Sequence, residues 1–86
     1  MPRISAIRGE VQRLLHAAPF RPFVLTLENG EHAKIGHPEN IAFDPSLAEG
    51  VDGWDEFYVI SSKLRIFSTF GAVTSIALLD QGQLAG

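Results

Sequence analysis

The two prolines in segment 19–22 separate a helical pattern from a series of strand patterns. Proline lacks an N–H and disfavours the α conformation in the residue before it, so a helix must end before this segment. The next residues alternate as in a β-strand, with one face formed by Phe23, Leu25 and Leu27. Asn29-Gly30 follows and predicts a tight hairpin turn, because both residue types tolerate positive φ. We expect the chain to change from helix to sheet here.

Upstream of the prolines, apolar residues recur at helical spacing. They are Ile4, Ile7, Val11, Leu14, Leu15 and Ala18. This stripe predicts an amphipathic helix over residues 4–18, with most of the polar side chains, Arg8 among them, off the stripe.

Downstream, short strand patterns follow one another, separated by turn residues. We expect strands over 31–36, 41–44, 57–60, 64–68 and 73–79, with a turn at 61–63. One helix before several short antiparallel strands predicts a mainly β, α+β fold. The specific prediction is a five- to six-stranded small barrel (Sm-like or SH3-like) over 22–79, with the helix covering its open end. A helix packed flat on an open sheet is the alternative. The predicted domain is 1–80, and 81–86 is predicted to be a disordered tail.

The composition narrows the class of protein. With 86 residues and 45% apolar residues, the chain can bury one core, and self-association would stabilise so small a domain. It contains no cysteine, which excludes disulfides and thiolate sites. A net charge of −3 gives no general attraction to nucleic acid or anionic membrane. No apolar run approaches the roughly 20 residues of a membrane span, and no secretory signal pattern is present, so we expect a cytoplasmic protein.

Residues 44–56 form a long acidic segment with turn glycines and no lysine or arginine. Loops of this length tend to be functional or mobile. Its candidate interaction residues are Trp54, Asp52 and Asp55. Trp54 either stands exposed as a protein contact or folds back over one end of the barrel, and the sequence leaves both open. The acidic residues lack the spacing of a calcium-binding loop.

No arrangement of residues indicates catalysis or metal binding. His32 and His37 point to opposite faces of a straight strand, and no thiolate supplements them. The chain has no nucleophile elbow and no phosphate-binding glycine loop. We therefore predict no enzymatic activity, no cofactor and no metal.

Several segments resemble a widespread family of short uncharacterised bacterial proteins. They are the helix exit at 16–23 with its Pro-Phe-Arg-Pro-Phe sequence, the Asn29-Gly30 turn, the His-Pro-Glu step at 37–39 and the Val-Thr-Ser-Ile ending at 73–76. The resemblance implies a fold with a leading helix and implies no activity. More distantly, the order of Leu25, Leu27, Asn29-Gly30, Gly36 and Phe43-Asp44 is similar to the first motif of Sm-like and Hfq-like proteins. That resemblance implies a helix on a small barrel that assembles into rings and binds RNA.

Arg21, between two phenylalanines, is the candidate for an RNA contact, because a guanidinium beside aromatic rings can stack on a base. The structural interpretation is that the phenylalanines enter the core and Arg21 pairs with a carboxylate or carbonyl.

Our preferred prediction from sequence is a non-enzymatic module that acts through protein contacts and forms a homo-oligomer. The edges near Ile41–Phe43 and along the last strand are the expected means of self-association. The alternative is an Sm-like RNA-binding ring.

Overall fold

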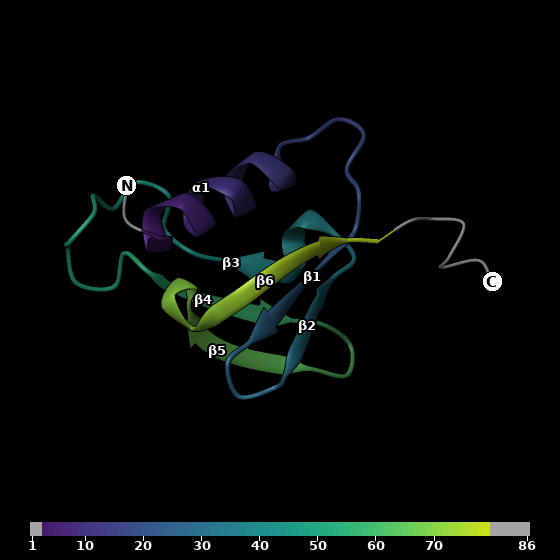
Figure 1. Cartoon of the computed structure of the whole chain (residues 1–86). Coiled ribbons are helices and arrows are strands. Elements are labelled where there is room, and N and C mark those ends of the chain that lie inside the picture. The colour runs from purple at the N-terminus through teal and green to yellow at the C-terminus, as the bar shows by residue number, and fades with distance from the viewer. Residues whose placement is uncertain (1–2, 80–86) are drawn as a thin grey trace.

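The computed structural model describes residues 3–79, which form one helix and six strands (Figure 1). The helix is α1 (Arg3–Leu15). The strands are β1 (Phe23–Leu27), β2 (His32–Ile35), β3 (Ile41–Ala42), β4 (Glu56–Ile60), β5 (Arg65–Thr69) and β6 (Val73–Leu78). Two 3₁₀ turns, η1 (Pro38–Asn40) and η2 (Phe70–Ala72), precede β3 and β6. The fold is mixed α+β and mainly β, as the sequence predicts.

The strands form two antiparallel sheets of three strands each, in the orders β2-β1-β6 and β3-β4-β5. The prediction of one five- to six-stranded barrel is therefore wrong, since no closed barrel forms within residues 3–79. The break falls between β2 and β3. There the chain turns through η1, and Pro38 has no N–H to continue a strand ladder. As a result β2 pairs only with β1, and β3 only with β4.

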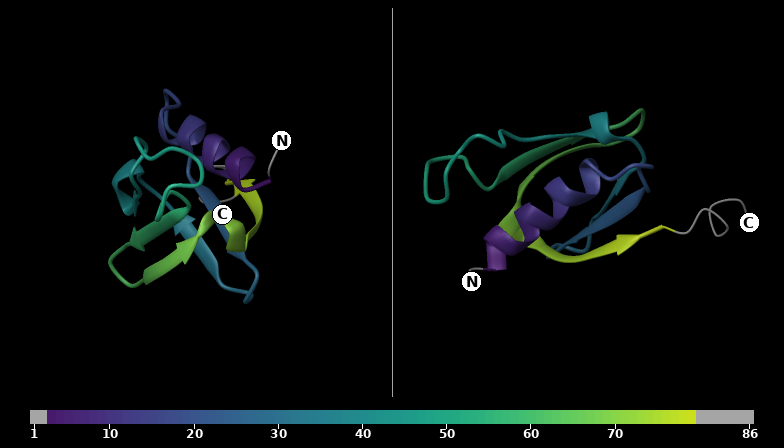
Figure 2. Two further views of the ribbon diagram at one scale, coloured as in Figure 1. Left: turned by 90° about the vertical axis from the view of Figure 1, so that its left-hand side faces the viewer. Right: turned by 90° about the horizontal axis from the view of Figure 1, so that it is seen from above.

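The two sheets lie inclined to each other with α1 across them, and their inner faces form one core (Figure 2). The predicted inner face of β1 is confirmed, because Phe23, Leu25 and Leu27 are buried. The other buried core residues are Val11 and Leu14 from α1, Ala33 and Ile35 from β2, Ile41, Phe57, Val59 and Ile66 from the second sheet, and Phe70 and Val73. The stripe of α1 thus packs on both sheets.

Most strand ends differ by one or two residues from prediction, and the helix end and the β1–β2 turn also differ. The helix ends at Leu15 instead of residue 18, because the residue before Pro19 is disfavoured in the α conformation and the chain must leave the helix earlier. The β1–β2 connection is residues 28–31, longer than a two-residue turn: the Gly30 N–H donates to the carbonyl of Leu27, and the Leu27 N–H donates to the carbonyl of Glu31. Gly30 has a φ of +90°, so its predicted turn conformation is confirmed.

Two further predictions concern the C-terminal tail and membrane spanning. The tail at 81–86 lies outside the described residues. Within residues 3–79, α1 is too short and too polar to cross a membrane.

Candidate interaction surface

The acidic loop, residues 43–55, joins β3 to β4 and lies against α1 through Arg8. The guanidinium of Arg8 donates from Nε to the carbonyl oxygen of Trp54 at 2.9 Å. Its Nη2 donates to the carbonyl oxygens of Asp44 at 2.7 Å and Leu47 at 3.5 Å. One side chain on the helix thus holds both ends of the loop. Ser5, one turn earlier, donates its hydroxyl to Glu49 Oε1 at 2.8 Å.

Trp54 packs on Arg8 and is half-buried. The guanidinium carbon of Arg8 lies 5.9 Å from the centroid of the Trp54 ring and 5.5 Å from that of Phe43, which are cation–π distances. Of the two predicted positions of Trp54, the structure shows the one folded back on the protein. Asp55 is also half-buried, and its carbonyl oxygen accepts the N–H of Phe70 at 2.7 Å.

Asp44 begins the exposed part of the loop, and its carboxylate accepts two hydrogen bonds from Ser46. The Ser46 hydroxyl lies 2.6 Å from Asp44 Oδ1 and the Ser46 N–H lies 2.9 Å from it. These bonds, and next the charge of Arg8, lower the pKa of Asp44 from its ordinary value. The carboxylate is therefore held in its charged form at neutral pH.

The outer face of the β3-β4-β5 sheet carries an aromatic pair. Tyr58 on β4 lies directly opposite Phe67 on β5, with ring centroids 5.9 Å apart at an interplanar angle of 72°. Ala42 on β3 lies beside Tyr58 on the same face. The Phe67 side chain is 65% exposed, the highest value among the large exposed apolar residues of the described chain.

A groove of about 380 Å³ separates this aromatic pair from the acidic loop. We call it the acidic–aromatic groove. It is lined by Ala42, Phe43, Asp44, Leu47, Asp52, Gly53, Glu56, Phe57, Tyr58 and Phe67. Three carboxylates line it and no lysine or arginine does. None of the three forms a salt bridge within residues 3–79. Aromatic faces beside carboxylates favour a cationic, partly apolar side chain.

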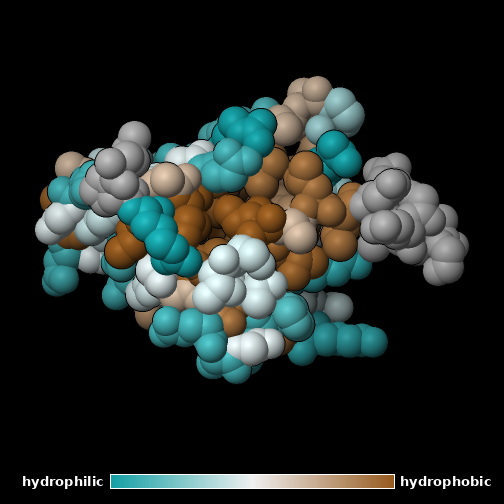
Figure 3. All heavy atoms as spheres, viewed as in Figure 1, coloured by the Kyte–Doolittle hydropathy of each residue, from teal (hydrophilic) through white to brown (hydrophobic). Residues whose placement is uncertain are grey.

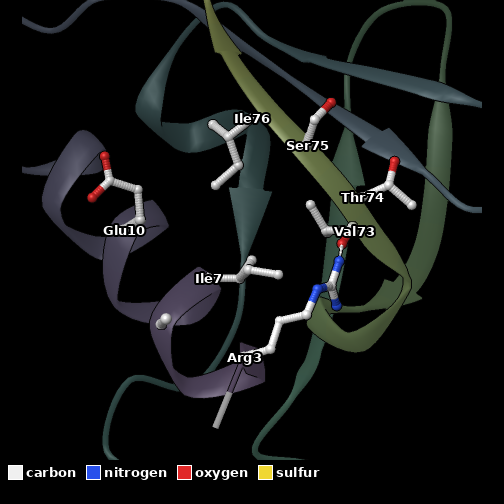
Figure 4. Close-up of a pocket in the computed structure, with 8 residues that line it drawn as sticks. Arg3, Ile7, Glu10, Val73, Thr74, Ser75 and Ile76 are labelled. Carbon is white, nitrogen blue, oxygen red and sulfur yellow. Dashed lines mark hydrogen bonds between the residues drawn. The ribbon is translucent and has the colours of Figure 1, made fainter. Parts of the chain in front are cut away.

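A second groove, of about 360 Å³, runs between α1 and β6, where hydrophobic residues gather on the face shown in Figure 3. Figure 4 shows Ile7 and Ile76 directed into it from the two elements. Its charged residues have partners elsewhere: Arg3 donates to the carbonyl oxygens of Gly71 and Val73, and Glu10 pairs with Arg13. This groove therefore offers apolar surface without a free charge.

No protein-family model, no curated protein and no solved structure matches the chain. The two family resemblances stay predictions.

The remaining predicted site residues do not gather at one place. Asp52 lines the acidic–aromatic groove, whereas Trp54, which packs on Arg8, and Asp55 do not. Arg21 is exposed in the segment between α1 and β1, at the opposite end of the molecule from the acidic loop (Figure 1). Of its two aromatic neighbours, Phe23 is fully buried and Phe20 is half-buried, with ring centroids 6.1 Å apart.

The histidines also do not form a site. The His32 ring lies 3.2 Å from the Thr26 hydroxyl. Within the part of the chain that the structure describes, no group of three His, Asp or Glu side chains is placed to hold a metal ion.

The sequence reasoning missed the aromatic part of the groove. Tyr58 and Phe67 each occupy an outward position of a predicted strand, and that alternation was the available signal. It also missed Arg8, whose partners are backbone carbonyl oxygens that no residue pattern reveals.

Proposed function

We propose that the protein is a non-enzymatic binding module whose acidic–aromatic groove takes a basic, partly apolar segment of a partner protein. The observation that carries this proposal is the exposed Phe67 ring, packed on Tyr58 beside the carboxylates of Asp44, Asp52 and Glu56. Contiguous exposed apolar surface, such as this aromatic pair, marks interaction sites, and aromatic residues are frequent among the residues that dominate binding energy.

The charges of the groove select the partner. The three lining carboxylates, with no lysine or arginine among the lining residues, repel acidic ligands and attract arginine or lysine, and an aliphatic stem can lie along the two rings. Because the site is open and its charges are solvent-exposed, we expect modest affinity that weakens as salt is added.

A peptide titration tests this proposal. The probe is a capped pentapeptide of alternating arginine and leucine, with a glutamate–leucine peptide as the matched control. Amide NMR signals of segments 42–44, 52–58 and 66–68 should shift with the basic peptide and not with the acidic one. Phe67→Ala should weaken binding by about tenfold, the effect of losing roughly 1.4 kcal/mol.

Ile60→Ala is the matched control variant, since Ile60 is 50% exposed on the same strand as Tyr58 but does not line the groove. It should bind the basic peptide as the native protein does. If the basic peptide causes no saturable shifts, or if Phe67→Ala and Ile60→Ala weaken binding equally, the proposed groove is wrong.

Self-association is the second part of the proposal. Both edges named from the sequence are outer strands of their sheets, β3 for Ile41–Phe43 and β6 for the last strand. An outer strand has backbone groups free to pair with a second copy. The apolar groove lined by Ile7 and Ile76 lies along β6, and Leu78, two residues after Ile76 on this strand, is 45% exposed. A second copy pairing along β6 would bury this surface.

Sedimentation equilibrium over a wide concentration range tests the second part. We expect a mass above that of the 9.4 kDa chain, lowered towards it by Ile76→Lys. Ile60→Lys is the control, because Ile60 is a 50% exposed apolar residue on β4, the central strand of the other sheet, and does not line this groove. A monomer at every concentration contradicts self-association and leaves the peptide test unaffected.

The RNA-binding alternative has less support. It was motivated by phenylalanines beside Arg21, and the burial of Phe23 removes one of them as a stacking surface. A titration with single-stranded RNA at low and high salt separates the two proposals, because affinity driven by phosphates falls steeply with salt.

A further inference from the structure

A cleft of about 460 Å³ lies where the end of β2, the turn η1 and the β4–β5 turn meet. We call it the lysine cleft. It is lined by Lys34, Gly36, His37, Asn40, Ser61, Ser62, Lys63 and Leu64. The β4–β5 turn is at the opposite end of β4 and β5 from the acidic loop (Figure 1). The lysine cleft is therefore separate from the acidic–aromatic groove.

The lysine cleft is lined by positively charged side chains and by no negatively charged one. Lys34 belongs to the β2-β1-β6 sheet and Lys63 to the turn of the other sheet, and no Asp or Glu is among the lining residues. Glu39, the acidic residue of η1, is exposed and does not line it. Within residues 3–79, neither lysine forms a salt bridge or a side-chain hydrogen bond.

The arginines of α1 show the contrast. Arg3 and Arg8 donate to backbone carbonyl oxygens, and Arg13 pairs with Glu10. Within residues 3–79, the ammonium groups of Lys34 and Lys63 make no such hydrogen bond or ion pair. Because both lysines line one cleft that no carboxylate lines, the potential there is positive and favours an anionic ligand.

The walls of the lysine cleft are tied together by Asn40. Its Nδ2 donates to the carbonyl oxygen of Ile60 at 3.0 Å, and its Oδ1 accepts the N–H of His37 at 2.9 Å. The β4–β5 turn is closed by a bond from the Ser61 N–H to the carbonyl of Leu64 at 2.8 Å. These bonds fix η1, which follows β2, to the end of β4 and close the β4–β5 turn, and residues of η1 and of this turn line the cleft.

The donor set is suited to phosphate. Two ammonium groups, the hydroxyls of Ser61 and Ser62 and the imidazole of His37 can all donate to phosphate oxygens. The volume falls in the usual range of small-molecule sites. No phenylalanine, tyrosine or tryptophan lines the cleft, so His37 is the one ring that could stack on a base, whereas sites for single-stranded RNA typically stack successive bases on several rings. We propose that the lysine cleft binds the phosphate groups of a small phosphorylated molecule.

This site is independent of the proposed protein-binding groove, and its test uses different probes. Isotope-labelled protein is titrated with inorganic pyrophosphate, with ADP and with a short oligouridine, at constant ionic strength. We expect saturable shifts of amide signals in segments 34–40 and 61–64 with pyrophosphate and ADP at up to millimolar concentrations. Lys34→Gln and Lys63→Gln should each weaken binding by about tenfold, as expected for the loss of a charged hydrogen bond.

Arg65→Gln is the matched control. Arg65 is an exposed cation just after the β4–β5 turn and does not line the lysine cleft. It should leave pyrophosphate binding within about twofold of the native value, because exposed charges are screened. All three variants change exposed side chains, and thermal unfolding checks that each is folded.

Three outcomes overturn the proposal. The first is the absence of saturable shifts in the two segments. The second is an equal loss of affinity in Arg65→Gln, which indicates diffuse electrostatic attraction. The third is oligouridine binding more tightly than ADP, with a steep salt dependence, which assigns the surface to RNA.

Discussion

The Nε atom of Arg8 donates a hydrogen bond to the carbonyl oxygen of Trp54 at 2.9 Å, between residues 46 positions apart. The same guanidinium donates to the carbonyl of Asp44 at 2.7 Å. A planar guanidinium with five fixed donors can serve two carbonyl oxygens at once, which a lysine cannot do in the same geometry. The acidic loop therefore takes its position from α1, and so do the carboxylates that line the acidic–aromatic groove.

Replacing Arg8 with alanine should lower the free energy of unfolding by about 1–3 kcal/mol, because partly buried carbonyls lose a charged donor. Urea unfolding measures the loss, and the fluorescence of Trp54, the only tryptophan, reports the change around the loop directly. Arg8→Lys should recover only part of the stability. Arg13→Ala is the control: Arg13 pairs with Glu10 on the exposed face of α1, so we expect little change. Equal losses from both variants would contradict the role given to Arg8.

Two glycines should respond in opposite directions to an added side chain. Gly30 has a φ of +90° in the β1–β2 turn, so Gly30→Val should destabilise the fold by about 1–3 kcal/mol. Gly9 lies inside α1 with open space around its Cα, so Gly9→Ala should stabilise it by about 0.5–1 kcal/mol. Thermal unfolding of the two variants and of the native protein shows whether each substitution raises or lowers the stability. A neutral Gly30→Val would mean that the turn has another conformation in solution.

The alternating faces of the strands and the position of the helix were predictable from the sequence, because buried residues recur at a characteristic spacing in each type of element. Phe23, Leu25 and Leu27 had to share a face once the prolines ended the helix. The division of the strands into two sheets, in place of one barrel, was not predictable from this spacing. Whether β2 runs on into β3 depends on how the chain turns at Pro38, and that turn divides the strands into two sheets.

The pairing of Tyr58 with Phe67 shows why the groove was missed. A three-residue turn at 61–63 pairs Ile60 with the residue at 64, which puts Tyr58 opposite Ile66. In the structure, the Ser61 N–H donates to the Leu64 carbonyl, so Ser61 lies opposite Leu64 and Ile60 pairs with Arg65. The register is shifted by one, so Tyr58 pairs with Phe67. A single residue in a turn thus decides which side chain lies beside Tyr58.

Phe70 should be among the most sensitive positions of the core. It is fully buried on η2, with ring centroids 5.1 Å from that of Phe43 and 4.9 Å from that of Phe57. Phe70→Ala should cost about 3–5 kcal/mol, since it removes both ring contacts and leaves a cavity. Phe67→Ala should cost about 0.2–1 kcal/mol, because only its cross-strand pair with Tyr58 is lost. Guanidinium unfolding measures both values. If Phe67→Ala were as costly as Phe70→Ala, Phe67 would have a structural role and the proposed binding role would lose its main support.

The stability of the folded protein should depend on pH through Asp44. Hydrogen bonds from Ser46 lower the pKa of Asp44 in the folded protein, so the charged form is favoured by folding. A group with a lowered folded pKa adds stability at pH values above its unfolded pKa, and that stability is lost as the pH falls through the folded pKa. Ser46→Ala should therefore raise the pKa of Asp44, seen by carboxyl NMR titration, and should lower stability at neutral pH. The stability difference from the native protein should shrink on acidification.

Ser75→Ala is the control for this measurement, because Ser75 is exposed on β6 and makes no side-chain hydrogen bond within residues 3–79. It should leave the titration of Asp44 unchanged. A stability difference between native protein and Ser46→Ala that is constant from neutral to strongly acidic pH would show that the Ser46 hydroxyl acts on something other than the charge of Asp44. The loop end at Asp44 would then be held by Arg8 alone, and the carboxylate would be free to turn towards a cation in the groove.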